Sequence, residues 1–196
     1  PAGDPDRCST CLYATATDGW NNRDNVYAGR ICNIRAPADV VNSSKWEFVT
    51  GVDLAGNATW GAYASAVPIY RDPGKVGMTG WTYLPDSGKY LSVQFYYPDP
   101  AVSSNTKWHF VECDHPWGPC AANLLDVQSP IPGSYGVSVN SAWSDFTSGT
   151  LVVTCSGDYT THNAAPNATV YTLYTQSIRL PDATARPTRP IRADAR

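Results

Sequence analysis

A carboxylate that could take part in acid–base chemistry, Asp72, stands directly before a predicted strand in the run Arg71-Asp72-Pro73-Gly74. Cleavage of a glycosidic bond needs two carboxyl groups about 5 to 10 Å apart, one protonated and one ionised. The segment before the comparable later strand supplies Ser134 and Tyr135 instead, so Asp72 is the one candidate catalytic residue. The same run is also a favourable turn sequence, which gives Asp72 a purely structural alternative.

Three loops place an acidic residue beside aromatic or amide side chains, a combination that suits sugar binding. Carboxylates and amides hydrogen-bond hydroxyl groups, while an aromatic face packs on the apolar side of a sugar ring. Asp-Gly and Pro-Asp are equally common turn formers, so each loop also has a structural interpretation. Trp20 is the exception, because a Trp in a polar Gly/Asn loop has no evident core to join. The candidate ligand-binding residues are Asp18, Trp20, Asp99, His115, Trp117 and Asp158.

Neither a metal site nor a serine nucleophile is predicted. In the run Glu112-Cys113-Asp114-His115, a carboxylate and a His one or two residues apart rarely converge on one ion, because neighbouring side chains of a strand point to opposite faces. Cys8 and Cys11 have zinc-like spacing but no matching second pair. The chain has no Gly-x-Ser-x-Gly elbow. We therefore expect no metal and no cofactor.

Short β-strands must position these residues, because Gly or Pro interrupts nearly every window before a helix of about 12 residues could form. The sequence repeats itself loosely, since Ser87–Val93 returns as Ser148–Val153 and both copies run into an acidic turn. Repetition every roughly 50 to 60 residues, built from short strands, is typical of β-propeller blades. The predicted fold class is all-β, a β-propeller or partial propeller of about three to four four-stranded blades.

Alternating and β-branched runs define the predicted strands, and two short helical turns are expected between them. The strands are predicted at Leu12–Thr17, Val26–Cys32, Trp46–Thr50, Val76–Tyr83, Tyr90–Tyr97, Trp108–Cys113, Gly136–Trp143, Thr150–Cys155 and Val170–Arg179. The helical turns are predicted at Pro37–Val41 and Ala121–Val127.

The strands group into blades at 11–51, 60–120 and 130–180, within a single all-β domain of residues 1–180. Residues 181–196 are rich in Pro and Arg and are predicted to form an extended tail. An incomplete propeller exposes unpaired strand edges. Either the chain closes on itself, or it pairs with copies of itself as a homo-oligomer, or N-terminal blades are missing. Because the first residue is Pro1, we expect a processed mature form or a fragment of a longer polypeptide.

The runs Ala66–Val76, Tyr83–Leu91 and Trp108–Pro119 resemble secreted glycosidase-like five-bladed β-propellers. The most similar group comprises proteins with a DUF4185-like domain, some of which cleave arabinan-type polysaccharides. The resemblance covers about residues 12 to 180 and corresponds to the later blades of that domain. It implies a polysaccharide-processing, glycoside hydrolase-like protein that acts on or binds arabinan-type or related glycans. Fold analogy does not prove activity. The alternative is a non-catalytic carbohydrate-binding or self-assembling extracellular structural glycoprotein.

Six cysteines form an even set, which suits three disulfides in an oxidising compartment. The family pattern has small or aromatic residues where this chain has Cys113 and Cys120, and a disulfide between these two would staple the tight turn that they flank. Among the other four, a bond between Cys11 and Cys32 would tie adjacent strands. That choice leaves Cys8 and Cys155, and the three ways of pairing these four cysteines stay open.

Three N-glycosylation sequons begin at Asn42, Asn57 and Asn167, and with the cysteines they predict a secreted, extracellular glycoprotein. The formal net charge is −3, and the fourteen Lys and Arg residues are scattered or collected in the tail, so no nucleic-acid footprint is expected. No apolar run approaches the ~20 residues of a membrane helix. The expected partner is therefore a polysaccharide or glycan, rather than a nucleic acid or a membrane.

Overall fold

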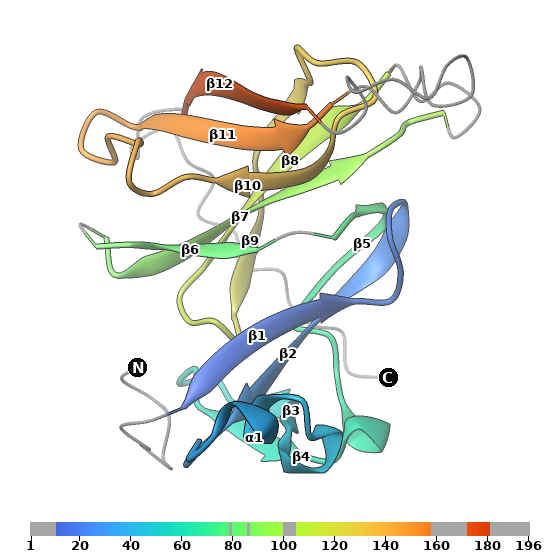
Figure 1. Cartoon of the computed structure of the whole chain (residues 1–196), viewed down its shortest axis with the longest axis vertical. Helices are drawn as coiled ribbons and strands as arrows, with labels where there is room; N and C mark the ends of the chain where they lie inside the picture. The colour runs from blue at the N-terminus through green and yellow to red at the C-terminus, as the bar shows by residue number, and fades with distance from the viewer. Residues whose placement is uncertain (1–10, 79, 86, 100–104, 158–171, 181–196) are drawn as a thin grey trace.

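The computed structural model describes residues 11–78, 80–85, 87–99, 105–157 and 172–180 of the 196-residue chain. These residues form three antiparallel β-sheets, one short α-helix and two 3-10 segments. None of the three sheets closes on itself. Figure 1 shows the sheets one above another along the longest axis, in the order in which they occur in the chain. The prediction of an all-β fold is confirmed.

The first sheet is built from the N-terminal part of the described chain. Its strands are β1 (Leu12–Thr17), β2 (Arg23–Ile31), β3 (Glu47–Val52), β4 (Ala58–Gly61) and β5 (Tyr70–Val76). They pair in the order β1-β2-β3-β4, and β5 pairs with β2. Val26 of β2 pairs with both Thr17 of β1 and Tyr70 of β5, so β1 and β5 lie on opposite edges of β2. The connections contain α1 (Pro37–Val40) and the 3-10 segments Ser43–Lys45 and Tyr63–Ser65.

The second and third sheets are simple meanders in which consecutive strands pair. The second sheet contains β6 (Trp81–Leu84), β7 (Lys89–Tyr96), β8 (Lys107–Cys113) and β9 (Cys120–Gln128). The third contains β10 (Tyr135–Val139), β11 (Thr150–Ser156) and β12 (Leu173–Arg179). The register of β7 against β8 is regular from Tyr90 opposite Cys113 to Tyr96 opposite Lys107.

The second sheet is buried on both faces. Side chains of a strand alternate between the two faces, and each face of this sheet contributes to a different core cluster. Leu91, Val93 and Phe95 of β7 belong to a core cluster shared with strands of the third sheet. Val111 of β8 belongs to another cluster, which includes Tyr70 of the first sheet. Each fully buried Val, Leu or Phe side chain contributes about 1.5–3 kcal/mol. These two clusters therefore fix the second sheet between its neighbours.

Most predicted strands are present, with several corrections. The predicted strand Gly136–Trp143 ends at Val139, as β10. The predicted strand Val76–Tyr83 is interrupted, because β5 ends at Val76 and β6 begins only at Trp81. The predicted helical turn Ala121–Val127 is wrong, since these residues lie in β9 and pair with β8. Strands β4, β5 and β9 were not predicted. The predicted helical turn at Pro37–Val41 is confirmed as α1.

The blade boundaries also differ from the prediction. Residues 60–76 were assigned to the second blade, but β5 in this segment pairs with β2 of the first sheet. The second sheet instead spans residues 81–128. Its four consecutively paired strands match the strand number of a blade, and an arrangement of the sheets as propeller blades remains a proposal. The predicted tail, 181–196, lies outside the described residues.

The favoured disulfide Cys113–Cys120 is confirmed, and Cys11–Cys32, one of the pairings left open, is present; each joins neighbouring strands of one sheet. Cys11 bonds to Cys32 across the β1–β2 hairpin, and Cys113 bonds to Cys120 across the β8–β9 hairpin. Among the described residues Cys155 forms no disulfide, and its thiol is buried with apolar side chains of the third sheet. Cys8 lies outside the described residues.

Candidate functional site

An irregularity in β5 presents Asp72 at the surface. Arg23 of β2 pairs with Val76, whereas Asn25 pairs with Arg71, so residues 72–75 lie opposite the single residue Asp24. Gly74 has φ +76° in this segment, and its N–H donates to a carboxylate oxygen of Asp24 at 3.0 Å. The sequence that predicted a turn thus forms a bulge inside a strand. Bulges re-aim side chains and are common next to active sites.

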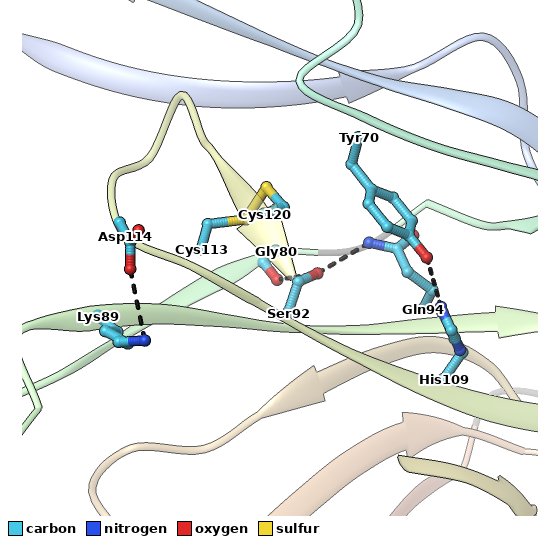
Figure 2. The surroundings of a disulfide bond; sticks show 9 residues. All are labelled: Tyr70, Gly80, Lys89, Ser92, Gln94, His109, Cys113, Asp114 and Cys120. Atoms are coloured by element: carbon cyan, nitrogen blue, oxygen red, sulfur yellow. Dashed lines mark hydrogen bonds and ion pairs between the residues drawn. A yellow bond between two sulfur atoms is a disulfide. The ribbon is translucent and has the colours of Figure 1, made fainter. Parts of the chain in front are cut away.

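Tyr70, Asp72 and His109 meet where β5 crosses β8. The Tyr70 hydroxyl lies 2.5 Å from His109 Nε2, as Figure 2 shows, and donates to Asp72 Oδ2 at 3.3 Å. His109 Nε2 is itself 3.4 Å from Asp72 Oδ2. Burial lowers the pKa of His109, while burial and the nearby Asp72 charge raise the pKa of Tyr70. Both side chains are therefore neutral at pH 7.

His109 is fully buried, and its Nδ1 atom has no hydrogen-bond partner among the residues that the structure describes. A buried polar atom without a partner costs about 1–3 kcal/mol of stability. Such atoms are uncommon in folded proteins and call for a reason, of which a functional role is one. Since only Nε2 makes a polar contact with the described part of the chain, packing and the contact with the Tyr70 hydroxyl hold the imidazole in place.

A second carboxylate, Asp126, joins this group from β9. His109 pairs across the sheet with Gln94 of β7 and with Asp126 of β9, so all three side chains share one face. Tyr96, two residues beyond Gln94, shares that face too, and its hydroxyl donates to Asp126 Oδ2 at 2.7 Å. Burial, the bond to Asp126 and the charge of Asp72 raise the pKa of Tyr96.

Lys75 lies between the two carboxylate–tyrosine pairs. Its Nζ atom is 3.8 Å from Asp72 Oδ2 and 5.8 Å from the centre of the Tyr96 ring. The Asp72 side chain is 20% exposed, and Asp126 is exposed, so the group opens to solvent through its two carboxylates. We refer to it as the tyrosine–carboxylate cluster. Its members are Tyr70, Asp72, Lys75, Tyr96, His109 and Asp126.

A chain of hydrogen bonds fixes the backbone beside this cluster, and Figure 2 shows the part of it that joins Gln94, Ser92 and Gly80. The Gly77 N–H donates to Gln94 Oε1 at 3.2 Å, Gln94 Nε2 donates to Ser92 Oγ at 2.8 Å, and Ser92 Oγ donates to the Gly80 carbonyl at 3.2 Å. A Cβ atom at Gly77 would lie 2.3 Å from the Phe95 carbonyl oxygen. The connection from β5 to β6 therefore lies directly against β7, which sets the position of the strand that carries Asp72.

Sequence reasoning found Asp72 but missed the second carboxylate. Asp126 was hidden because Ala121–Val127 was interpreted as a helical turn. A usable signal was present, since Leu125 and Val127 flank Asp126 with the period of two that a strand produces. His109 was correctly placed in a strand, but the sequence gave no indication that it faces Tyr70.

The acidic loop residues that were predicted to bind ligand differ in their surroundings. Asp18 accepts hydrogen bonds from the Asn25 backbone N–H at 3.4 Å and from Asn25 Nδ2 at 2.9 Å, so it closes the β1–β2 turn. Asp99 is exposed beyond the end of β7. Asp158 lies outside the described residues.

Trp20 is 45% exposed, but it does reach a core, contrary to the prediction. Its ring centre lies 6.2 Å from that of Phe95 and 5.8 Å from that of Tyr135. Phe95 belongs to the core shared with the third sheet, whereas Tyr96 faces Lys75 of the first sheet. The structure therefore places Trp20 and the tyrosine–carboxylate cluster on opposite faces of β7.

The prediction that Trp117 contacts a ligand is corrected by its burial. The ring is 0% exposed, packs with Trp60 and Tyr13, and donates its indole N–H to the Gly56 carbonyl at 3.0 Å. His115 stacks on Trp117 with a ring distance of 5.1 Å and is half-buried. Both residues join the β8–β9 hairpin to the first sheet, which is a structural role.

Within the described part of the chain, no group of three or more His, Cys, Asp or Glu side chains is arranged to hold a metal ion. The helices of that part are all too short to cross a membrane.

No protein-family model matches the chain, and neither does any curated protein. One matching solved structure is that of a "putative hydrolase" from Bacteroides ovatus ATCC 8483, with 17% sequence identity and a TM-score of 0.48. The match covers 85% of this chain and 41% of that protein, so the chain spans about two fifths of its length. At this identity and TM-score the likeness assigns neither an activity nor a ligand to the chain.

Proposed function

We propose that this chain is part of a secreted, glycoside hydrolase-like protein and that Asp72 and Asp126 are its paired carboxylates. One observation carries the proposal: two carboxylates from different strands contact two tyrosine hydroxyls around a buried, neutral histidine. Hydrolysis of a glycosidic bond uses such a pair, one as acid and one as nucleophile or base. The second carboxylate, which sequence reasoning missed, belongs to β9.

The contacts suggest a role for each member of the pair. Asp72 faces the Lys75 ammonium and is assigned as the charged nucleophile or base. Asp126 is the other carboxyl of the cluster and is assigned as the acid, because Asp72 already has the charged role. In the reaction, the bond from the anomeric carbon to the leaving oxygen breaks and that oxygen takes the Asp126 proton. The anomeric carbon is attacked by the Asp72 carboxylate or by water that Asp72 deprotonates.

Several observations support the wider proposal. The two disulfides fit an oxidising compartment, and hence an extracellular protein. The resemblance to glycosidase-like propellers suggests arabinan-type or related glycans as substrates. Three sheets that follow one another and do not close fit a partial propeller, which further blades or a second copy of the chain would complete. Sedimentation velocity distinguishes a homo-oligomer from a monomer.

The test is an activity assay on arabinan, arabinoxylan and a panel of aryl glycosides. We expect kcat/KM to fall by about 10²- to 10⁴-fold in Asp72→Asn and in Asp126→Asn, the usual effect of removing a general acid or base. Asp114→Asn, which changes an exposed carboxylate in the β8–β9 turn, is the matched control and keeps full activity. Absence of hydrolysis across the panel by folded protein, or full activity in both variants, would contradict the proposal.

Trp20 favours a second candidate, non-catalytic carbohydrate binding. Its exposed ring face offers the apolar surface on which a sugar ring packs. If this is the function, calorimetric titration with soluble oligosaccharides detects binding without turnover, and Trp20→Ala weakens it by about 3- to 10-fold. Unchanged affinity in Trp20→Ala would remove Trp20 from the site.

A further inference from the structure

A groove on the first sheet lies far in sequence from the tyrosine–carboxylate cluster. It has a volume of about 600 Å³ and lies between the β2–β3 connection and the segment after β4. Its apolar wall includes Val41, Trp46, Phe48 and Tyr63, and its polar rim includes Ser43 and Ser44. Phe48 and Tyr63 pack edge to face, with ring centres 5.1 Å apart. Val41 and Tyr63 are nevertheless 85% and 69% exposed, which leaves apolar surface uncovered in the groove.

A glycosylation sequon, Asn42-Ser43-Ser44, lies within the rim of this groove. Asn42 is exposed, and its neighbours Val41 and Ser43 both line the groove. Its Oδ1 atom accepts the Ser44 N–H at 3.1 Å and the Ser44 hydroxyl at 2.7 Å, which caps the 3-10 segment that follows. N-glycosylation modifies Nδ2 rather than Oδ1. The cap and the modification are therefore compatible.

The sequon at Asn57 has different surroundings and provides a comparison. Asn57 Nδ2 donates to Asp53 Oδ2 at 2.9 Å, and the Asn57 backbone N–H donates to Asp53 Oδ1 at 2.8 Å. These bonds lower the pKa of Asp53 and form the turn between β3 and β4. The next residue, Ala58, is buried in β4. Asn57 Nδ2 is thus already used by the fold.

We propose that Asn42 carries an N-linked glycan whose first sugar occupies this groove and packs against Tyr63 and Phe48. In the modification, Asn42 Nδ2 bonds to the anomeric carbon of a lipid-linked glycosyl diphosphate. The bond from that carbon to the diphosphate oxygen breaks, the diphosphate leaves, and the amide nitrogen loses one proton. This inference is independent of the proposed hydrolase activity, because it involves neither Asp72 nor Asp126.

Two features of the groove suit a tethered sugar. The apolar face of a pyranose ring packs on aromatic side chains, while Ser43 and Ser44 offer hydrogen bonds to its hydroxyls. Because the sugar is covalently attached at the rim, it loses little translational freedom on entering the groove. Even modest packing therefore suffices to keep the sugar in place and to cover the exposed apolar wall.

The experiment compares chain secreted from a glycosylating eukaryotic host with chain from an oxidising host that lacks N-glycosylation. Peptide mapping is expected to show Asn42 occupied, and the glycosylated protein is expected to melt about 2–4 °C higher, the shift that a small stabilisation produces in a chain of this size. An endoglycosidase that leaves only the first sugar is expected to preserve that difference. An unoccupied Asn42, or loss of the difference on trimming, overturns the proposal.

Variants separate packing in the groove from a general effect of glycosylation. Tyr63→Ala is expected to stay glycosylated but to lose the difference in Tm between hosts, whereas Tyr63→Phe, which keeps the aromatic face, retains it. Asn57→Gln is the matched sequon control and leaves the difference unchanged, while Asn42→Gln abolishes it. If Tyr63→Ala keeps the full difference, the sugar does not occupy the groove and the inference is wrong.

Discussion

At the scale of single residues, the most informative side chain is His109. It pairs with residues of two neighbouring strands, contacts the Tyr70 hydroxyl through Nε2 and leaves Nδ1 buried without a partner. Removing the imidazole would relieve that unpaired atom but would also take a hydrogen-bond partner from Tyr70. These two effects on the free energy of unfolding oppose each other at a single pH. The pH dependence of stability is more informative, because it isolates the protonation of the imidazole.

Burial lowers the pKa of His109 below its ordinary value of 6.5. Above that pH both the folded and the unfolded chain carry a neutral imidazole. As the pH falls below it, the unfolded chain takes up a proton that the folded chain does not, so the free energy of unfolding falls until the folded-state pKa is reached. We expect Tm to fall more steeply between about pH 7.5 and pH 5 in the wild type than in His109→Gln.

Calorimetry at low ionic strength measures this difference in slope. Tyr70→Phe is the matched control, because it removes the contact with Nε2 but leaves the imidazole buried, and it is expected to keep the slope of the wild type. Parallel curves for the wild type and His109→Gln would show that His109 is not the group that titrates.

Two tryptophans show how residue type alone misleads about burial. Trp117 lies in a Trp-Gly-Pro turn and Trp20 lies in a polar loop, and both were predicted to bind ligand. The structure buries Trp117 completely and leaves Trp20 45% exposed. The difference arises from the β8–β9 hairpin, which delivers Trp117 to the carbonyl of Gly56 on a distant loop. No local pattern encodes that contact.

We expect the two substitutions to differ accordingly. Trp117→Ala leaves a cavity between the first sheet and the hairpin, and should lower the free energy of unfolding by about 3–5 kcal/mol. Trp20→Ala removes a ring that is already half in solvent and should cost much less. Urea denaturation measures both, and equal losses would contradict the burial of Trp117.

At the scale of elements, the short connection from β5 to β6 governs how the first and second sheets meet. Gly77 approaches the backbone of β7 so closely that a Cβ atom would lie 2.3 Å from the Phe95 carbonyl oxygen. Gly80, three residues later, has no atom within 4 Å of such a position. In this connection, packing against β7 requires glycine at position 77 but does not require it at position 80.

This contrast predicts opposite outcomes for two similar changes. Gly77→Ala must push β7 away from the connection and should cost about 3 kcal/mol, the upper end of ordinary overpacking. Gly80→Ala should be close to neutral. The midpoints of urea unfolding compare the two directly, and a tolerated Gly77→Ala would mean that the connection does not lie against β7.

Sequence patterns predicted the strands whose own residues show the alternation of apolar side chains that is typical of a strand. β1 has the predicted bounds, and β7, β8 and β11 differ by one residue at one or two ends, because their apolar side chains alternate without interruption. β4, β5 and β9 were missed, since their pairing depends on partners elsewhere in the chain. The Arg71–Gly74 run has turn chemistry but lies within a strand, where pairing with β2 converts the turn into a bulge.

At the scale of the whole molecule, the three sheets associate through apolar clusters rather than through shared strands. The second sheet is covered on both faces, so it depends on both neighbours for its burial. Cys155 reports on this arrangement, because its free thiol lies in the cluster between the second and third sheets and burial raises its pKa to about 11. Both effects suppress its reaction with thiol reagents.

We expect the Cys155 peptide to stay unlabelled by an alkylating reagent at about pH 8 in the native protein and to become labelled in denaturant. Mass mapping of the labelled peptides measures this, with Cys155→Ser as the control that loses the signal. Rapid labelling of native protein, or a map that places Cys155 in a disulfide, would contradict the packing of the third sheet on the second.

Both disulfides of the described chain close a hairpin inside one sheet, and neither spans two sheets. Under a pulling force applied at the two ends of the described chain, nothing covalent beyond the backbone itself would couple one sheet to the next. The sheets should then give way in separate steps, and the residues inside each closed hairpin should add no length until the bond is reduced. A single-molecule extension trace recorded with and without reductant would therefore differ by two short, countable increments.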